Sequence, residues 1–227
     1  MDLGGQLRLE LEHPASFSRD RFVVSASNRD AVQTVDSWSG EIGGALALIG
    51  PAGSGKTHLA SAWAERTGAV RLSAHTLADE KFEFITGPML LDSADVAAHG
   101  EAFFHLLNKA AQPGNALLLT GRAPPSSWPV QVQDLRSRLN ALPVAQLLEP
   151  DDAILNGVLV KLFLERSIRP PQDLLAYLVR RIERSVPAAQ AIVVALDEAA
   201  AAEHRAVSRS LARELLKDDR AEPEGED

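Results

Sequence analysis

The sequence predicts an α/β fold in which a five-stranded parallel sheet with flanking helices is followed by a small helical domain. Short apolar runs that fit buried parallel strands alternate with helical patterns as far as Leu147. From Glu149 and Pro150 onward, only helical patterns remain. A glycine-rich segment at 50–57 stands between the first apolar run and the first helix, as in folds that bind phosphate groups.

The expected elements of the sheet part follow from length and periodicity. Strands are predicted at 45–49, 69–72, 88–91, 116–119 and 144–147, and helices at 58–66, 100–111 and about 132–140. Gly68 and the Pro113-Gly114 pair end two of these helices. Because the strands alternate with helices, we expect them to be parallel, with a ligand bound at their carboxyl ends.

The second part of the chain is predicted to be entirely helical. Its expected helices cover about 152–166, 171–184, 187–203 and 205–216. The final eleven residues contain six acidic and two basic side chains, which predicts a disordered, solubilising tail.

Composition excludes several classes of function. The net charge is −8, and no basic block of the kind that follows a nucleic-acid backbone occurs, so direct DNA binding is disfavoured. The absence of cysteine excludes disulfides and thiolate metal sites. The first residues lack the pattern of a signal peptide, and no apolar run reaches 18 residues, so we expect a cytoplasmic protein without a membrane partner.

The segment Gly50-Pro-Ala-Gly-Ser-Gly-Lys-Thr57 matches the phosphate-loop pattern G-x-x-x-x-G-K-[ST]. Its glycines allow successive backbone N–H groups to converge on phosphate oxygens. Lys56 supplies a positive charge for the β- and γ-phosphates, and the Thr57 hydroxyl is a ligand for Mg²⁺. The alternative is a glycine-rich turn without a ligand. The predicted nucleotide-binding residues of the loop are Gly50, Pro51, Ala52, Gly53, Ser54, Gly55, Lys56, Thr57 and His58.

Polar residues after the third and fourth strands could complete this site. Asp92 ends the third strand and is predicted to hold Mg²⁺, although a lone Asp there is often only a helix cap. The next residue is Ser93, whose hydroxyl is a poor general base, so we expect weak hydrolysis unless Asp95 substitutes. Thr120 ends the fourth strand and can present its hydroxyl to the γ-phosphate or the attacking water.

Two arginines lie on the helix before the fifth strand. Arg136 and Arg138 would usually form a solvated helix face. Their position after the fourth strand also allows an arginine to be inserted into a nucleotide site.

These motifs in series resemble the AAA+ core of the DnaA-related proteins, and more closely the Hda-type regulatory inactivators, over about residues 5–215. The resemblance implies an AAA+ P-loop NTPase fold with a C-terminal helical lid. It implies roles for individual residues: Phe22 and Val23 lie over the adenine, 50–57 is Walker A, 89–92 is Walker B, Thr120 is sensor 1, and Arg138 is an arginine finger that acts in trans.

The sequence departs from the DnaA pattern in two places. No helix-turn-helix domain follows the lid in this sequence, so we expect no sequence-specific DNA binding. The sensor 2 arginine should fall within 185–188, where the alignment places Pro187. Arg180, Arg181 or Arg184 could replace it.

A short N-terminal peptide is similar to the one by which Hda-type proteins dock on the replicative sliding clamp, the β subunit of the polymerase. Leu7, Leu9 and Leu11 share one side of an extended segment and can fill an apolar groove, while Gln6 bonds at its rim. The alternative is an edge strand that packs on its own domain. The resulting division is a clamp-binding peptide at 1–12, an AAA+ core at 13–149, a lid at 150–216 and an acidic tail at 217–227.

The resemblance therefore implies a negative regulator of replication initiation. Docked on the DNA-loaded clamp, it would stimulate hydrolysis of the ATP bound to DnaA, while its own site holds ADP or ATP with Mg²⁺. Two other classes stay open: an autonomous AAA+ ATPase of the helicase-loader kind, and a P-loop kinase of small molecules. Whether the chain forms a homodimer through the Arg138 face is also left open.

Overall fold

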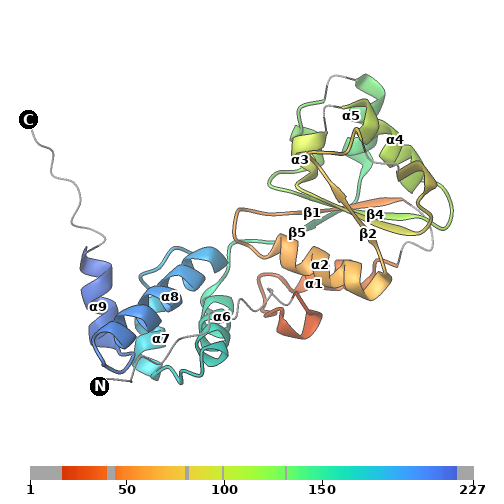
Figure 1. The fold of residues 1–227 in the computed structure, drawn as a ribbon. Coiled ribbons are helices and arrows are strands. Elements are labelled where there is room, and N and C mark those ends of the chain that lie inside the picture. Colours follow the sequence, from red (N-terminus) through yellow and green to blue (C-terminus); the bar gives the residue numbers. More distant parts are fainter. Residues whose placement is uncertain (1–16, 40–43, 80–81, 99, 131, 219–227) are drawn as a thin grey trace, which may run out of the picture.

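The computed structural model describes residues 17–39, 44–79, 82–98, 100–130 and 132–218. It consists of a sheet-containing core and a helical lid (Figure 1). The N-terminal peptide with Gln6, Leu7, Leu9 and Leu11 and most of the acidic tail lie outside the described residues.

The core contains the predicted five-stranded parallel sheet. Its strands are β1 (Ala45–Ile49), β2 (Val70–Ser73), β3 (Pro88–Asp92), β4 (Ala116–Gly121) and β5 (Val144–Gln146), in the order β2-β3-β4-β1-β5. All neighbouring pairs are parallel. The pairing of β1 with β4 brings Leu48 opposite Thr120, so the phosphate loop and Thr120 meet at one edge of the sheet.

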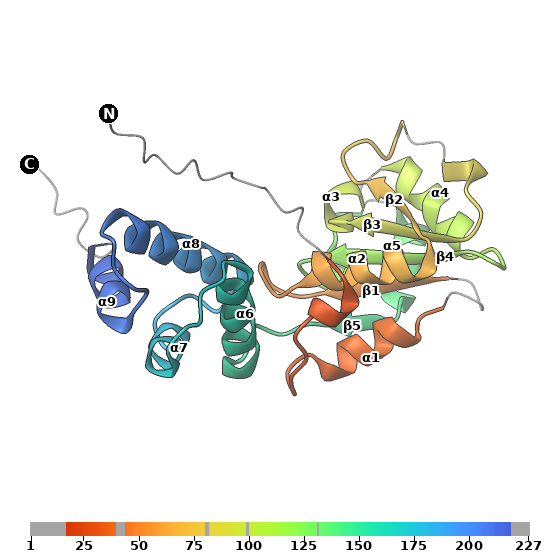
Figure 2. The same cartoon turned by 60° about the horizontal axis from the view of Figure 1, so that its bottom comes forward.

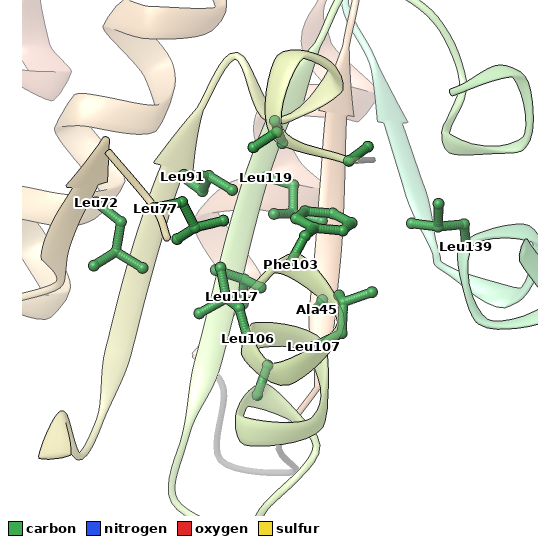
Figure 3. Close-up of a cluster of buried hydrophobic side chains, with 14 of the residues drawn as sticks. Ala45, Leu72, Leu77, Leu91, Phe103, Leu106, Leu107, Leu117, Leu119 and Leu139 are labelled. Atoms are coloured by element: carbon green, nitrogen blue, oxygen red, sulfur yellow. The ribbon is translucent and has the colours of Figure 1, made fainter. Parts of the chain in front are cut away.

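Helices cover both faces of the sheet (Figures 1 and 2). On one face lie α1 (Arg29–Ser37) and α2 (Lys56–Thr67), and on the other lie α3 (Ala94–Ala97), α4 (Glu101–Ala110) and α5 (Gln133–Ala141). Side chains of β4 alternate between the two apolar clusters: Leu118 packs with α2, whereas Leu117 and Leu119 pack with α4. Figure 3 shows the cluster that contains Leu117, Leu119 and Phe103.

Helix α1 and the short helix α3 are additions to the predicted elements. Helix α1 buries Ala31, Val32 and Val35 on one face of an otherwise polar stretch, and α3 has a single turn. The described part of the core also contains the 3₁₀ turns η1 (Arg19–Arg21), η2 (Phe82–Phe84) and η3 (Pro125–Ser127).

The lid consists of α6 (Asp152–Glu165), α7 (Gln172–Val179), α8 (Val186–Ala202) and α9 (Arg209–Asp218), which share an apolar core of their own. Two predicted boundaries were wrong. Helix α7 ends at Val179, because the chain must turn before Ser185 caps α8 in an extended conformation. Helix α9 begins only at Arg209, where the Ser208 hydroxyl accepts a bond from the Leu211 N–H.

The lid meets the core at its first helix and at the start of α8. The Asp151 carboxylate caps α6 by accepting the Ile154 N–H at 2.8 Å, and it also accepts the Ser25 hydroxyl at 2.6 Å. The Val186 N–H donates to the Gly53 carbonyl of the phosphate loop at 3.1 Å. None of the helices in the described part of the chain combines the length and apolar character needed to cross a bilayer.

Candidate functional site

The phosphate loop connects the end of β1 to the start of α2. Gly53 and Gly55 have φ angles of 72° and 96°, a conformation that side chains other than glycine rarely adopt. At Gly50 the obstacle is space, since a Cβ atom would lie 2.5 Å from the Leu147 carbonyl oxygen. The geometry therefore requires glycine at Gly50 and Gly55, the two positions that the sequence motif defines, and also at Gly53.

Lys56, the first residue of α2, turns back over the loop. Its Nζ donates to the carbonyl oxygens of Gly50 and Pro51, both at 2.8 Å. Burial lowers the pKa of Lys56, the Asp92 carboxylate opposes this effect, and the Arg122 guanidinium adds to the lowering. A partly desolvated ammonium at a helix N-terminus is suited to bind phosphate oxygens.

The predicted metal ligands meet beside the loop. The Thr57 hydroxyl donates to Asp92 Oδ2 at 3.1 Å, and the Thr120 hydroxyl donates to Asp92 Oδ1. Among the described residues, no group of three or more His, Cys, Asp or Glu could hold a metal. The hard oxygen atoms of Thr57 and Asp92 fit a Mg²⁺ ion that takes its other ligands from phosphate and water.

The backbone after β3 is unusual at Ser93. This residue has a φ of 56°, and its N–H donates to the Thr120 hydroxyl at 2.8 Å. Asp95 lies two residues further on, in α3, where its Oδ2 accepts the Arg122 N–H at 3.2 Å. Asp95 and Arg122 are thus joined at the carboxyl ends of the strands, and sequence reasoning did not identify Arg122.

Aromatic side chains of the N-terminal segment lie beside the loop. The Phe22 and His58 rings contact each other edge to face, with centroids 5.3 Å apart, and a Cβ at Gly55 would lie 3.0 Å from the Phe22 ring. Val23 packs against the lid, since a Cβ at Gly157 would lie 2.9 Å from Val23 Cγ1. The structure therefore places Phe22 and His58 beside the loop and Val23 against the lid.

We expect His58 to make the stability of the fold depend on pH. Burial lowers the pKa of His58 below its ordinary value of 6.5, although its bond to the Ser18 carbonyl, at 3.0 Å, opposes the effect. The unfolded chain then binds more protons than the folded chain just below pH 6.5, so the free energy of unfolding falls as the pH drops through that range. Urea titrations across this range should show a shallower decline for His58→Gln. The exposed control His75→Gln should keep the wild-type decline, and equal slopes in all three proteins would contradict the prediction.

The lid contacts the phosphate loop through Ser185 and Pro187. A Cβ at Gly53 would lie 2.6 Å from Ser185 Cβ and 3.0 Å from Pro187 Cδ. Pro187, at the position expected for sensor 2, therefore packs against the loop but offers no charge to a phosphate.

Two of the three arginines considered as replacements for sensor 2 have other partners. The Arg184 guanidinium bonds Asp152 at 2.7 Å and the Pro150 carbonyl at 3.3 Å. Arg181 lies over the Tyr177 ring, 5.5 Å from its centroid. Arg180 is exposed on the turn after α7.

The two arginines of α5 differ in their surroundings. Arg136 donates three bonds to carbonyl oxygens of the preceding loop, those of Ser126, Trp128 and Val130, at 2.9, 3.1 and 2.7 Å. It is therefore a structural residue that holds this loop on α5.

Arg138 lies on the outer surface between α4 and α5, and 42% of its side chain is exposed. It bonds Asp134 at 3.2 Å and Asn108 Oδ1 at 2.5 Å, and its guanidinium lies 5.2 Å from the centroid of Phe104. Helix α5 packs into the apolar cluster on the α4 face, whereas α2 packs on the opposite face of the sheet. Arg138 therefore does not contact the phosphate loop of its own chain.

Comparison with known proteins relates this arrangement to replication initiators. No protein-family model matches the chain. The chromosomal replication initiator protein DnaA of Thermomicrobium roseum is 25% identical over 89% of this chain. The chain spans about half (50%) of the length of this curated relative.

Solved structures share the fold. Domain III of DnaA from Thermotoga maritima superimposes with a TM-score of 0.77 and 18% identity over 92% of this chain and 98% of that domain. AMPPCP-bound DnaA from Aquifex aeolicus gives a TM-score of 0.65 and 18% identity over 80% of this chain and 65% of that protein. The chain therefore shows homology to domain III of DnaA and has the AAA+ P-loop NTPase fold.

Proposed function

We propose that this protein is a negative regulator of chromosomal replication initiation. Docked on the DNA-loaded sliding clamp, it stimulates the hydrolysis of ATP bound to DnaA by inserting Arg138 into the partner's nucleotide site. Its own site binds ADP or ATP with Mg²⁺, which holds core and lid in the docking conformation. The structurally similar DnaA from Aquifex aeolicus was solved with bound AMPPCP, which supports an adenine nucleotide as the ligand.

The position of Arg138 is the observation that carries the proposal. The side chain is partly exposed and is held by Asn108 and Phe104 of α4, across the sheet from the α2 face. An arginine at such a place can stabilise charge only in the site of another molecule. A finger supplied in trans accelerates nucleotide hydrolysis by about 10³-fold or more in enzymes that use one.

The chain's own site supports a binding role more than rapid turnover. Ser93 occupies the position of the water-activating acid, and its N–H is bonded to Thr120. Pro187 occupies the position expected for the lid arginine. The site is therefore poor in groups that would assist hydrolysis.

The second part of the proposal is that residues 6–11 bind the sliding clamp. A tether that binds a clamp on the DNA raises the effective concentration of the protein near DnaA, without any new contact between the two.

Deletion of residues 1–12 is expected to abolish the clamp-dependent part of the stimulation. The assay follows hydrolysis of ATP preloaded on DnaA, with DNA that carries or lacks a loaded clamp, over a range of concentrations of this protein. Because avidity contributes about 10²-fold or more, the concentration of truncated protein that gives the same hydrolysis rate should be higher by that factor. Removal of residues 219–227 is the matched control and should leave the rate unchanged. Equal activity of the deleted protein and the wild type on clamp-loaded DNA would refute the tether, and no stimulation by either would refute the function.

An autonomous AAA+ ATPase is the second candidate, and Asp95 is the observation that favours it. Burial lowers the pKa of Lys56, and the Asp95 carboxylate is close enough to oppose this lowering, although it already accepts the Arg122 N–H. Steady ATP turnover by the isolated chain, without DnaA or clamp, would support this function over the first.

A further inference from the structure

Two arginines from different parts of the lid share one aromatic ring. The guanidinium carbon of Arg181, just after α7, lies 5.5 Å from the centroid of the Tyr177 ring. That of Arg209, the first residue of α9, lies 5.4 Å from the same centroid. Helices α7 and α9 pack in one apolar cluster, and α9 lies at the end of the lid away from the sheet (Figures 1 and 2). The ring therefore holds two cations together at the outer end of the lid.

Two further arginines extend this group. Arg180 precedes Arg181 and caps the C-terminus of α7. Arg213 follows Arg209 by four residues, which places both on the same side of α9. All four residues are exposed. We call Arg180, Arg181, Arg209 and Arg213 the lid arginine surface.

Acidic side chains do not neutralise this surface in the described part of the chain. None of its four arginines forms an ion pair there. Glu214, the neighbour of Arg213, instead bonds Arg205 at 3.1 Å. Elsewhere in the lid, Arg184 has an acidic partner, because Asp152 lies 2.7 Å from it. Neighbouring cations without such partners repel each other, so a row of anions placed against them would be stabilising.

The chemistry of the surface fits a phosphate backbone. The planar guanidinium group of arginine matches phosphate oxygens and can donate two parallel bonds to them. The Tyr177 ring restrains Arg181 and Arg209 before a ligand arrives, which lowers the entropy lost on binding. Since this ring already carries two guanidinium groups, it is not a free platform for an unpaired base. The surface is therefore suited to the backbone of a duplex rather than to its bases.

We infer that the lid arginine surface binds the phosphate backbone of duplex DNA without reading its sequence. The sequence shows no basic block, because the four arginines come from two separate segments that only the fold brings together. The net charge of the chain is −8, so the binding is weak and confined to low salt. It goes beyond the proposed function, in which the protein reaches DNA only through the clamp, and adds a second attachment to the same DNA.

The test measures binding of the full chain to a fluorescent duplex of about 20 base pairs by anisotropy, without clamp or DnaA. With four phosphate contacts, the wild-type affinity should fall by about 10²-fold between 50 and 200 mM salt. Arg181→Ala/Arg209→Ala should bind about tenfold or more weakly at 50 mM salt and lose only about tenfold over the same range, because two contacts remain. Arg181→Lys/Arg209→Lys keeps the charges and should keep most of the salt dependence. The control Arg19→Ala/Arg205→Ala removes the same charge from arginines already bonded to Asp36 and Glu214, and should keep the wild-type salt dependence.

The outcomes concern the lid arginine surface alone, because neither DnaA nor clamp is present. A reduced salt dependence confined to Arg181→Ala/Arg209→Ala, with equal affinity for a duplex of another sequence, supports the inference. No binding by the wild type at 50 mM salt would overturn it, and so would equal losses in the alanine variant and the control. Binding that appears only after removal of residues 219–227 would also overturn it, since the arginines would then belong to the acidic tail.

Discussion

Replacement of Arg138 by alanine is expected to reduce the stimulation of DnaA-bound ATP hydrolysis by about 10³-fold or more. The reason is electrostatic: the guanidinium is the group that would meet negative charge developing on the transferred phosphoryl group in the partner. In the free protein it rests on Asn108 and Phe104 and is partly exposed, so few contacts must break before it reaches outward. The measurement is single-turnover hydrolysis of ATP on DnaA with clamp-loaded DNA.

Two controls make the Arg138 result specific. Arg138→Lys keeps the charge but loses the planar fork that bonds two oxygens at once, so it should recover only part of the rate. Nucleotide binding by the variant chain itself should be unchanged, because α5 and α2 lie on opposite faces of the sheet. Full stimulation by Arg138→Ala would show that another residue enters the DnaA site.

Gly53→Ala is expected to destabilise the protein by about 2–4 kcal/mol and to displace the lid from the phosphate loop. Part of this cost, about 1 kcal/mol, comes from an alanine at a φ of 72°. A further 1–3 kcal/mol or so comes from overpacking, since the new methyl group would lie 2.6 Å from Ser185 Cβ. Urea unfolding measures the total, and the bond from the Val186 N–H to the Gly53 carbonyl should be lost with the displacement.

Gly68→Ala separates the two contributions. Gly68 caps the C-terminus of α2 with a φ of 68°, close to that of Gly53, but a Cβ there meets nothing within 4 Å. The Gly68→Ala variant should therefore lose only the conformational contribution, about 1 kcal/mol, from its free energy of unfolding. Equal destabilisation by the two variants would mean that the lid does not press on the loop.

The central strands of the sheet could be predicted from the sequence because their apolar runs are buried on both faces. All five residues of β1 are buried, as are all six of β4, so the pattern is continuous rather than alternating. Helix α1 is not among the predicted elements, although its buried side chains Ala31, Val32 and Val35 share one helix face in a polar stretch. The end of α7 depends on where Ser185 must lie to cap the next helix, and this requirement comes from tertiary structure.

The phosphate loop, Asp92 and Thr120 could be predicted because motif spacing and strand ends identify them, and the structure brings them together. The roles of the arginines could not be separated in this way. Arg136 and Arg138 have the same residue type on one short helix, and only the fold of the preceding loop gives Arg136 its three carbonyl partners. Arg122 follows no motif and becomes notable only through its neighbours in space.

The strand order has a consequence for how the protein folds. The lid core is drawn from one continuous stretch, Leu155 to Ala212, so its contacts are local in the chain. By contrast, β1 pairs with β4 and β5, which places Ala45 opposite Leu117 and Ala47 opposite Val144. Pairing of distant segments closes long loops and is slow. We therefore expect the phosphate loop to acquire its shape late, so that a growing chain binds no nucleotide until β5 has left the ribosome.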